Sequence, residues 1–282
     1  METMKTYTLD QWLLFFFIYC FVGWLWECGY VSVRTKKWTN RGFMRGPFLP
    51  IYGSGAIVIL FTTLPVRNNP ILVFVVSVIS ATILEFCTGT VMESMFKVRY
   101  WDYSRFKFNY KGYISLAAST AWGIGGTLLV FVVNRPVDAL VCSLPRTVSE
   151  LTAFALTVCV SCDFGASFKE AMDIRDFIIR ISEEKDRQIK RLEKRVDVMA
   201  AVYGDELEKG MERIGEIKVS SQEFFKDKID SLSEAQKKLL HRFINANPDA
   251  ESKLGNVSEF LTTLKKYKSV LTRKITKEDT VD

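Results

Sequence analysis

Five apolar segments, each long enough to cross a lipid bilayer as a helix, lie within the first 168 residues of this 282-residue chain. They cover roughly residues 9–30, 48–66, 71–92, 113–133 and 148–168. A helix of about 20 apolar residues spans the hydrocarbon core of a bilayer. Inside that core every backbone polar group must find its partner within the protein, and a helix satisfies this requirement by itself. The sequence therefore predicts an all-α, polytopic membrane helix bundle.

The remaining part of the chain has a different composition. Residues 1–168 carry 14 Lys and Arg against 9 Asp and Glu, whereas the rest carries 24 against 23. No apolar run after residue 168 is long enough to span a membrane. Within residues 169–282, apolar residues follow the three–four spacing of a helix at Ile189, Leu192, Val196, Met199 and Tyr203. We expect a transmembrane domain at 1–168 and a cytoplasmic, helical, partly coiled-coil-like tail at 169–282.

The basic loops predict an orientation. Lys and Arg gather in the loop after the first segment (Arg34, Lys36, Lys37, Arg41, Arg45) and in the loop after the third (Lys97, Arg99, Arg105, Lys107, Lys111). The loops around Arg67 and from Asn134 to Arg146 are poor in charge. Because basic loops remain cytoplasmic, five spans place the N-terminus outside and the C-terminus inside.

Carboxylates within the apolar segments mark a candidate site. Glu27 lies near the end of the first segment, and Glu85 and Glu93 lie on one helical face of the third. An ionised carboxylate that faces lipid costs roughly 3 kcal/mol or more, so these groups must face the bundle, water or a cation. The nearest expected cations are Arg41 and Arg45, in a turn rich in glycine and proline.

Two further patterns favour a structural interpretation. Small residues recur every four positions in the fourth segment, at Ser115, Ser119, Gly123 and Thr127. This spacing lets two helices approach closely. Asp102 lies among aromatic residues in the second basic loop, where it would pair with a loop arginine or, alternatively, act on a ligand.

A series of short motifs runs through the first four segments. In order they are Trp24–Glu27, Asn40–Phe43, Gly46–Pro47, Pro50–Gly53, Glu85, Gly89, Glu93, Trp101–Ser104, Asn109, Gly112 and Trp122–Gly123. Over residues 10–135 the chain closely resembles the bacterial ABC-transporter type IV (CmpB-like) permease family. The resemblance implies a multi-pass protein of the bacterial cytoplasmic (inner) membrane, and it supplies neither a substrate nor a catalytic residue.

The charged residues and the motifs together give a candidate ligand or ion-pair site. Its members are Glu27, Asn40, Arg41, Arg45, Tyr52, Glu85, Glu93, Asp102 and Asn109. Arginines suit an anionic group such as phosphate or carboxylate, or they neutralise the glutamates when no ligand is bound. We expect no catalytic residue, no metal and no cofactor, since the one CxxC pair, Cys159 and Cys162, lies in an apolar helix without accompanying histidines.

Three functions agree with these patterns. The first is a permease-like transporter subunit, which would need a separate ATPase subunit because the chain has no G-x-x-x-x-G-K-[ST] phosphate loop. The second is a membrane scaffold or sensor that binds a cytosolic protein through its tail. The third is a membrane-embedded enzyme that acts on a lipid headgroup with Glu85, Glu93 or Asp102 as acid or base.

Two expectations concern partners. Five spans are few for a translocation pathway, which suggests a homodimer. The balanced charge of the tail argues against nucleic-acid binding.

Overall fold

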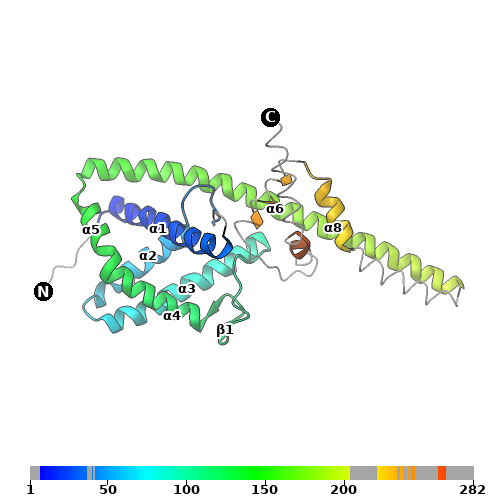
Figure 1. Cartoon of the computed structure of the whole chain (residues 1–282), viewed down its shortest axis with the longest axis horizontal. Coiled ribbons are helices and arrows are strands. Elements are labelled where there is room, and N and C mark those ends of the chain that lie inside the picture. The colour runs from blue at the N-terminus through cyan, green and yellow to red at the C-terminus, as the bar shows by residue number, and fades with distance from the viewer. Residues whose placement is uncertain are drawn as a thin grey trace. The chain divides into compact units, whose positions relative to one another are not determined.

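The computed structural model describes residues 7–36, 40, 42–203, 221–233, 236–237, 240–241, 243–244 and 260–264. The chain divides into two compact units, each considered by itself. The first consists of Met1–Met95 and Arg99–Lys169, and the second of Phe96–Val98 and Glu170–Asp282. The described residues are mostly helical, with one two-stranded hairpin (Figure 1).

The helices of the first unit include four candidate membrane spans. The elements are α1 (Leu9–Thr35), α2 (Pro50–Thr63), the 3₁₀ helix η1 (Leu64–Val66), α3 (Pro70–Phe96), α4 (Leu116–Leu128), the π-helix η2 (Leu129–Val133), α5 (Asn134–Ser143) and the beginning of α6 (Arg146–Tyr203). Strands β1 (Asn109–Tyr110) and β2 (Ile114–Ser115) pair antiparallel. By length and composition α1, α3, α4 to α5, and α6 can cross a membrane, and the apolar stretch Pro50–Val66 is shorter.

Two segment boundaries and one loop differ from the sequence prediction. The second segment begins at Pro50, since proline has no backbone N–H and therefore fits the first turn of a helix, where N–H groups have no partner within the helix. The fourth begins at Leu116, because Ser115 caps it by accepting from the Ala118 N–H at 3.2 Å. The expected loop from Asn134 to Arg146 was wrong. Those residues form α5, whose Val141 is 1% exposed in the core.

Helices α3 and α4 pack closely through small side chains. A Cβ atom on Gly123 would lie within 2.7 Å of the Phe74 ring, and one on Gly126 within 2.6 Å of the Ser77 Cβ. Between the same helices the Thr82 hydroxyl donates to Ser119 Oγ at 2.8 Å. The prediction of close packing is thus confirmed for Ser119 and Gly123.

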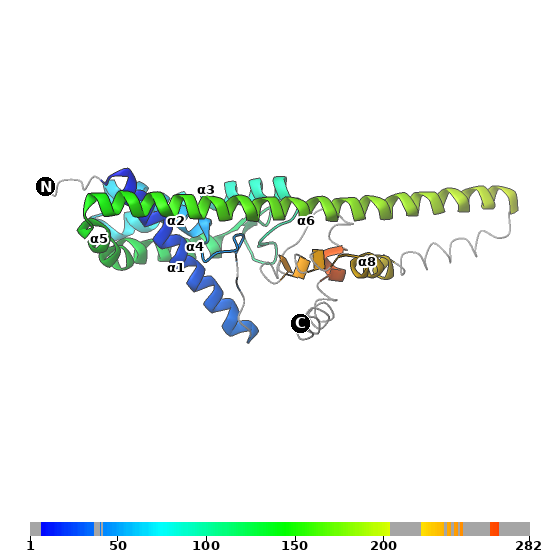
Figure 2. The same ribbon diagram turned by 90° about the horizontal axis from the view of Figure 1, so that it is seen from above.

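Helices α1 and α2 are neighbours in the same unit (Figure 1). The Leu49 N–H, just before α2, donates to the Cys20 carbonyl of α1 at 3.0 Å. Figure 2 shows α1 running at an angle to α6. Near the start of both helices the Ser149 hydroxyl donates to the Asp10 carboxylate. The buried apolar residues at the centre of this unit are Leu14, Phe15, Tyr19, Ala56, Ile59, Leu60, Val73, Ala81, Val130, Val141 and Ala153.

The second unit has its own apolar core. The later part of α6 contributes Ile174, Ile178 and Ile181, and α8 (Ser221–Asp230) contributes Phe225 and Ile229. Further members are Val98, Leu240, Ile244, Phe260, Leu261 and Leu264. The described tail residues are predominantly helical. The coiled-coil prediction rests on Ile189, Leu192, Val196, Met199 and Tyr203. The structure does not describe the side chains of these residues, so the coiled coil stays a prediction.

Candidate functional site

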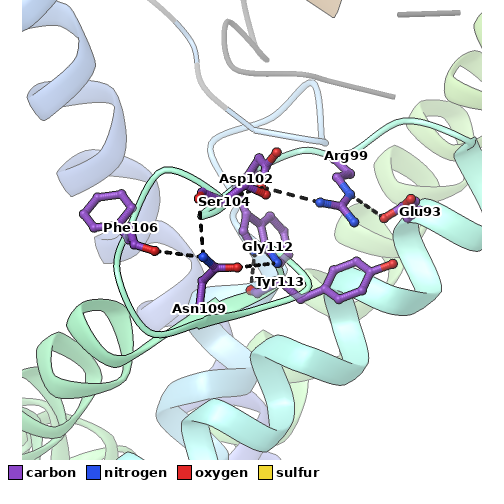
Figure 3. Close-up of polar contacts among 9 residues, drawn as sticks. Glu93, Arg99, Asp102, Ser104, Phe106, Asn109, Gly112 and Tyr113 are labelled. Atoms are coloured by element: carbon purple, nitrogen blue, oxygen red, sulfur yellow. Dashed lines mark hydrogen bonds and ion pairs between the residues drawn. The ribbon is translucent and has the colours of Figure 1, made fainter. Parts of the chain in front are cut away.

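One face of α3 carries the loop of residues 99–113, here called the 99–113 loop. Arg99 Nε donates to Glu93 Oε2 at 2.6 Å, as Figure 3 shows. Two helical turns earlier, the Tyr103 hydroxyl donates to Glu85 Oε1 at 2.9 Å. Residues four apart share a helical face, so both carboxylates meet the same loop.

Gly89 lies on α3 between Glu85 and Glu93, and two aromatic residues of the 99–113 loop pack against it. A Cβ atom on Gly89 would lie 3.2 Å from both the Trp101 and the Tyr113 ring, which is tighter than ordinary contact. The Trp101 indole N–H donates to the Tyr113 carbonyl at 3.0 Å, so the two residues are tied together over Gly89. Glycine at this point therefore lets the 99–113 loop lie directly on α3.

Asp102 stabilises the 99–113 loop by accepting hydrogen bonds from residues of the same loop. Its Oδ1 atom accepts from the Ser104 N–H at 2.8 Å and the Ser104 hydroxyl at 2.6 Å, and it lies 3.5 Å from Arg99 Nη1 (Figure 3). Asn109 Nδ2 donates to the Phe106 carbonyl at 2.8 Å and its Oδ1 accepts from the Gly112 N–H at 3.2 Å. Both predicted site residues thus bind the loop that contains them.

The hairpin turn closes the 99–113 loop. Lys111 and Gly112 have φ angles of 52° and 74°, and the Tyr113 N–H donates to the Tyr110 carbonyl at 3.1 Å. Positive φ at both central residues is the requirement of a type I′ hairpin turn. A side chain on Gly112 would also meet Arg99 Nη1 at 2.6 Å and Ser104 Oγ at 2.6 Å. The turn therefore requires glycine for its backbone and for space.

Arg99 is the cation that pairs with Glu93 of α3 and with Asp102 of the loop. Its side chain is 6% exposed, and its guanidinium lies 4.7 Å from the centroid of the Tyr113 ring. Burial lowers the pKa of Arg99, but the hydrogen bond to Glu93 and the charge of Asp102 raise it, so the net shift is upward. Arg99 therefore remains charged near neutral pH.

Glu85 is the most buried carboxylate of the predicted site. It is 5% exposed, and no hydrogen bond to its Oε2 atom is found in the described part of the chain. The Trp122 side chain of α4 lies near this carboxylate without meeting hydrogen-bond geometry. A buried acceptor without a partner costs about 1–3 kcal/mol, and more when it is charged. This oxygen is thus the strongest unsatisfied acceptor of the site.

Two further polar residues of the predicted site lie on other helices, Glu27 on α1 and Tyr52 on α2. The Tyr52 hydroxyl donates to Glu27 Oε2 at 2.9 Å. The Tyr52 ring centroid lies 5.9 Å from that of Trp122. Because Trp122 also lies near Glu85, a row of aromatic and acidic side chains connects α1, α2, α4 and α3.

The turn before α2 is held by backbone hydrogen bonds. The Arg45 N–H donates to Ser167 Oγ at 3.2 Å and the Gly46 N–H to Asp163 Oδ2 at 2.8 Å, both on α6. Asn40 accepts from the Trp24 indole at 2.6 Å and donates to the Arg45 carbonyl at 3.1 Å. The Arg45 residue itself is exposed.

The predicted site residues therefore fall into three groups. Glu85, Glu93, Asp102 and Asn109 lie on α3 or the 99–113 loop, Glu27 pairs with Tyr52, and Asn40 and Arg45 belong to the turn before α2. Arg41 lies outside the described residues.

Sequence reasoning missed Arg99, Tyr103 and Trp122 as members of the site. The expected pairing of Asp102 with a loop arginine is confirmed by Arg99, whose Nη1 lies 3.5 Å from Asp102 Oδ1, but the pairing of Arg99 with Glu93 was not predicted. Tyr103 and Trp122 both lie in the motifs of the sequence. Within the described ranges, no group of three or more His, Cys, Asp or Glu side chains is arranged to hold a metal ion.

Comparison with known proteins gives one family. A family model described as "Putative ABC-transporter type IV" matches residues 14–168, which contain the candidate site. No curated protein and no solved structure matches the chain.

Proposed function

Because the chain belongs to the family described as "Putative ABC-transporter type IV", we propose that it is the permease-like membrane subunit of a transporter. Four candidate membrane helices support a membrane location. The chain lacks a G-x-x-x-x-G-K-[ST] phosphate loop, so ATP is hydrolysed by a separate ATPase subunit. The tail or the basic loops, on the cytoplasmic side in our proposal, bind that subunit.

The observation that carries this proposal is the unsatisfied oxygen of Glu85. Its Oε1 atom is held by Tyr103, a residue of the 99–113 loop, whereas Oε2 has no hydrogen bond in the described structure. Ionisable residues within membrane helices mark substrate or proton pathways, because burying them unpaired is expensive. In our proposal Glu85 binds a proton or a polar substrate group during turnover, and the 99–113 loop moves as that oxygen is occupied and released.

The first experiment is affinity purification of the full chain from native membranes in mild detergent, followed by mass spectrometry. Recovery of a stoichiometric ATPase subunit is expected. Recovery of the chain without one contradicts the permease proposal and favours a transporter or scaffold that acts without ATP.

The purified complex then tests the role of Glu85. Glu85→Gln removes the charge with little change of shape, and ATP turnover in proteoliposomes should fall at least about tenfold while the ATPase subunit stays bound. Glu150→Gln is the matched control, because Glu150 is 51% exposed in a surface pair with Arg146. Equal turnover in wild type and Glu85→Gln would show that this carboxylate has no part in the cycle.

A scaffold or sensor is the second candidate, and the 99–113 loop supports it. Glu93 and Asp102 are engaged by Arg99 and Ser104, as expected for groups that only hold the loop on α3. In that case Glu85→Gln changes the melting temperature of the protein and leaves any partner-dependent activity unaffected. The same pair of variants therefore separates the two functions.

The proposed orientation has the N-terminus outside and the C-terminus inside, with five spans that include Pro50–Val66. Cys142, near the end of α5, is exposed and forms no disulfide, and the orientation places it outside. A membrane-impermeant maleimide should label it in intact cells, and Cys142→Ser should remove the label.

We also propose a homodimer, since few spans are available to enclose a pathway. Native mass spectrometry that yields only monomer from nanodiscs contradicts it.

A further inference from the structure

The 99–113 loop has an outer surface that its contacts with α3 leave uncovered. The middle part of the loop, residues 105–111, is here called the 105–111 segment. Every side chain of this segment except Asn109 is aromatic or basic, and these residues are all exposed: Arg105, Phe106, Lys107, Phe108, Tyr110 and Lys111. Figure 3 shows the Phe106 side chain at the far end of the loop from Arg99 and Glu93. We propose that the 105–111 segment binds anionic phospholipid headgroups at the membrane surface.

The helices on either side place this segment at a membrane surface. It lies between α3, which ends at Phe96, and α4, which begins at Leu116 (Figure 1). Both helices belong to candidate membrane spans. A short loop between two consecutive spans has to stay at the surface where the first span ends, so the 105–111 segment lies close to lipid headgroups whichever way the chain is oriented.

The segment also folds back along α3. The centroid of the Tyr110 ring lies 5.9 Å from that of the Phe86 ring. Phe86 precedes Phe96, the last residue of α3, by roughly 15 Å along the helix. α3 has 27 residues and is therefore about 40 Å long, whereas the hydrocarbon core of a bilayer is about 30 Å thick. Tyr110 and the residues beside it thus lie at the depth of the headgroups and do not extend beyond them into solvent.

Phe108 is held in an exposed position by its backbone. The residue is 81% exposed, and its carbonyl accepts from the N–H of Leu116, the first residue of α4, at 3.1 Å. Its φ angle is 57°, which is rare for a bulky residue and persists only where the surrounding structure holds it. An exposed ring of this size is stabilised by leaving water for the boundary between headgroups and acyl chains. The fold therefore directs Phe108 outward, where it enters this boundary.

The basic side chains of the segment select the charge of the lipid. Arg105, Lys107 and Lys111 are exposed, and none of them has an ion pair with a described acidic residue. The nearest acidic residue in the loop, Asp102, already accepts hydrogen bonds from Ser104. Each Lys or Arg near an anionic lipid surface strengthens binding about fivefold. In the proposed orientation the segment meets the cytoplasmic leaflet, which carries anionic lipids.

The position of the segment favours lipid over a protein as its partner. An acidic protein surface would also attract the three cations. Such a protein, however, would have to reach Tyr110 where its ring packs on Phe86, within a candidate span and at headgroup depth. Lipid is already present at that depth. The proposed ATPase subunit then binds the tail or the other basic loop.

Photo-crosslinking of the full chain in nanodiscs tests this surface. Phe108 is replaced by benzoylphenylalanine, an aromatic residue that forms a covalent bond to a neighbouring C–H group under ultraviolet light. The nanodiscs contain equal amounts of phosphatidylglycerol and phosphatidylcholine, and mass spectrometry identifies the lipid attached to the protein. Adducts of phosphatidylglycerol should exceed those of phosphatidylcholine at least about fivefold at low salt. The excess should shrink at high salt, because salt screens exposed charges.

Matched variants assign the lipid preference to the cations of the segment. With the same probe, Arg105→Gln/Lys111→Gln should bring the two adducts close to equal amounts. Arg135→Gln/Arg146→Gln also removes two exposed cations, but outside the segment, and should leave the excess unchanged. A probe at Phe154 is the second control. This residue of α6 is 70% exposed and far from any Lys or Arg in the sequence, so both lipids should be attached there equally.

Thermal unfolding shows whether each variant is folded, and Phe106, which is 50% exposed, is the alternative probe position if the change at Phe108 prevents folding. Three results overturn the proposal: no lipid adduct in the folded protein, equal adducts of the two lipids with all the basic residues in place, or an undiminished excess in Arg105→Gln/Lys111→Gln. An adduct with the ATPase subunit in place of lipid, in membranes that contain both, would assign the surface to a protein and equally overturn it. None of these outcomes depends on the transport activity proposed for the chain.

Discussion

Arg99 shows how a single buried charge can organise a loop. It contacts Glu93, Asp102 and the Tyr113 ring at once, with its side chain 6% exposed. Its guanidinium offers several donors in one plane, which an ammonium group does not, so lysine would be a poor replacement. Together with the Tyr103–Glu85 hydrogen bond and the packing of Trp101 and Tyr113 on Gly89, this side chain holds the 99–113 loop on α3.

Removing this charge should be costly because its two partners are acidic and largely shielded from water, at 13% and 16% exposure. Arg99→Met leaves Glu93 and Asp102 without their cation, and we expect a loss of about 3 kcal/mol or more, measured as a lower thermal midpoint in detergent. Adding Glu93→Leu to Arg99→Met should recover part of the loss, since replacing both charges avoids an unpaired one. Arg146→Met is the control, as its pair with Glu150 is on the surface, and it should have no measurable effect. A double variant that is no more stable than Arg99→Met alone would show that the two charges do not depend on each other.

Gly112 should tolerate no side chain. Gly112→Ala forces an L residue into a φ of 74° and brings its Cβ against Arg99 and Ser104. We expect destabilisation of at least about 1 kcal/mol and faster proteolysis of the 99–113 loop. Gly165→Ala, where a Cβ would meet nothing within 4 Å, should leave both measurements unchanged. Equal behaviour of the two variants would show that the described turn is not the one present in solution.

At the scale of elements, the contact between α3 and α4 can be tested within one short stretch. Gly123→Ala and Gly126→Ala place a methyl group against Phe74 and Ser77, and each should cost about 1–3 kcal/mol by overpacking. Gly125→Ala lies between them, where a Cβ has open space, and should be neutral or slightly stabilising. The measurement is thermal unfolding of the three purified variants. An equal gain in all three would reflect helix propensity alone and would contradict the expected overpacking at Gly123 and Gly126.

The sequence could predict much of this membrane unit, because apolar length and spacing are local properties. The spacing of Glu85 and Glu93 correctly placed both on the face of α3 that meets a loop. The helical state of α5 was missed, since its charged residues, Arg135 and Asp138, look like those of a loop unless Val141 is known to be buried.

Other features could not be predicted, because they depend on contacts between distant residues. The π turn before Asn134 has no spacing signature, and its hydrogen bond to Tyr19 joins residues 115 apart. The choice of Arg99 rather than Arg41 or Arg45 as partner of Glu93 depends on how the 99–113 loop folds back on α3. Whether the predicted site residues bind a ligand stays a prediction.

At the scale of the whole molecule, the core of the second unit includes a residue from far earlier in the chain. Val98 is 3% exposed and packs in the same cluster as Ile178 and Phe260. Val98→Asp places a carboxylate in that cluster, so we expect protease to cleave the second unit at lower concentration than in the wild type. The exposed Lys107 provides the control variant Lys107→Asp, which should leave cleavage unchanged. Identical cleavage of Val98→Asp and wild type would show that Val98 does not stabilise this core.

This arrangement sets the order in which the protein is completed during synthesis. Val98 leaves the ribosome long before Phe260, and at about 5–20 residues per second the interval of roughly 160 residues takes about 10 to 30 s. Meanwhile all of Arg99–Lys169 is translated. The second unit can therefore close its core only in a chain whose membrane segments have already been made. Truncated products of interrupted translation would lack that core, which would leave them open to quality-control proteases.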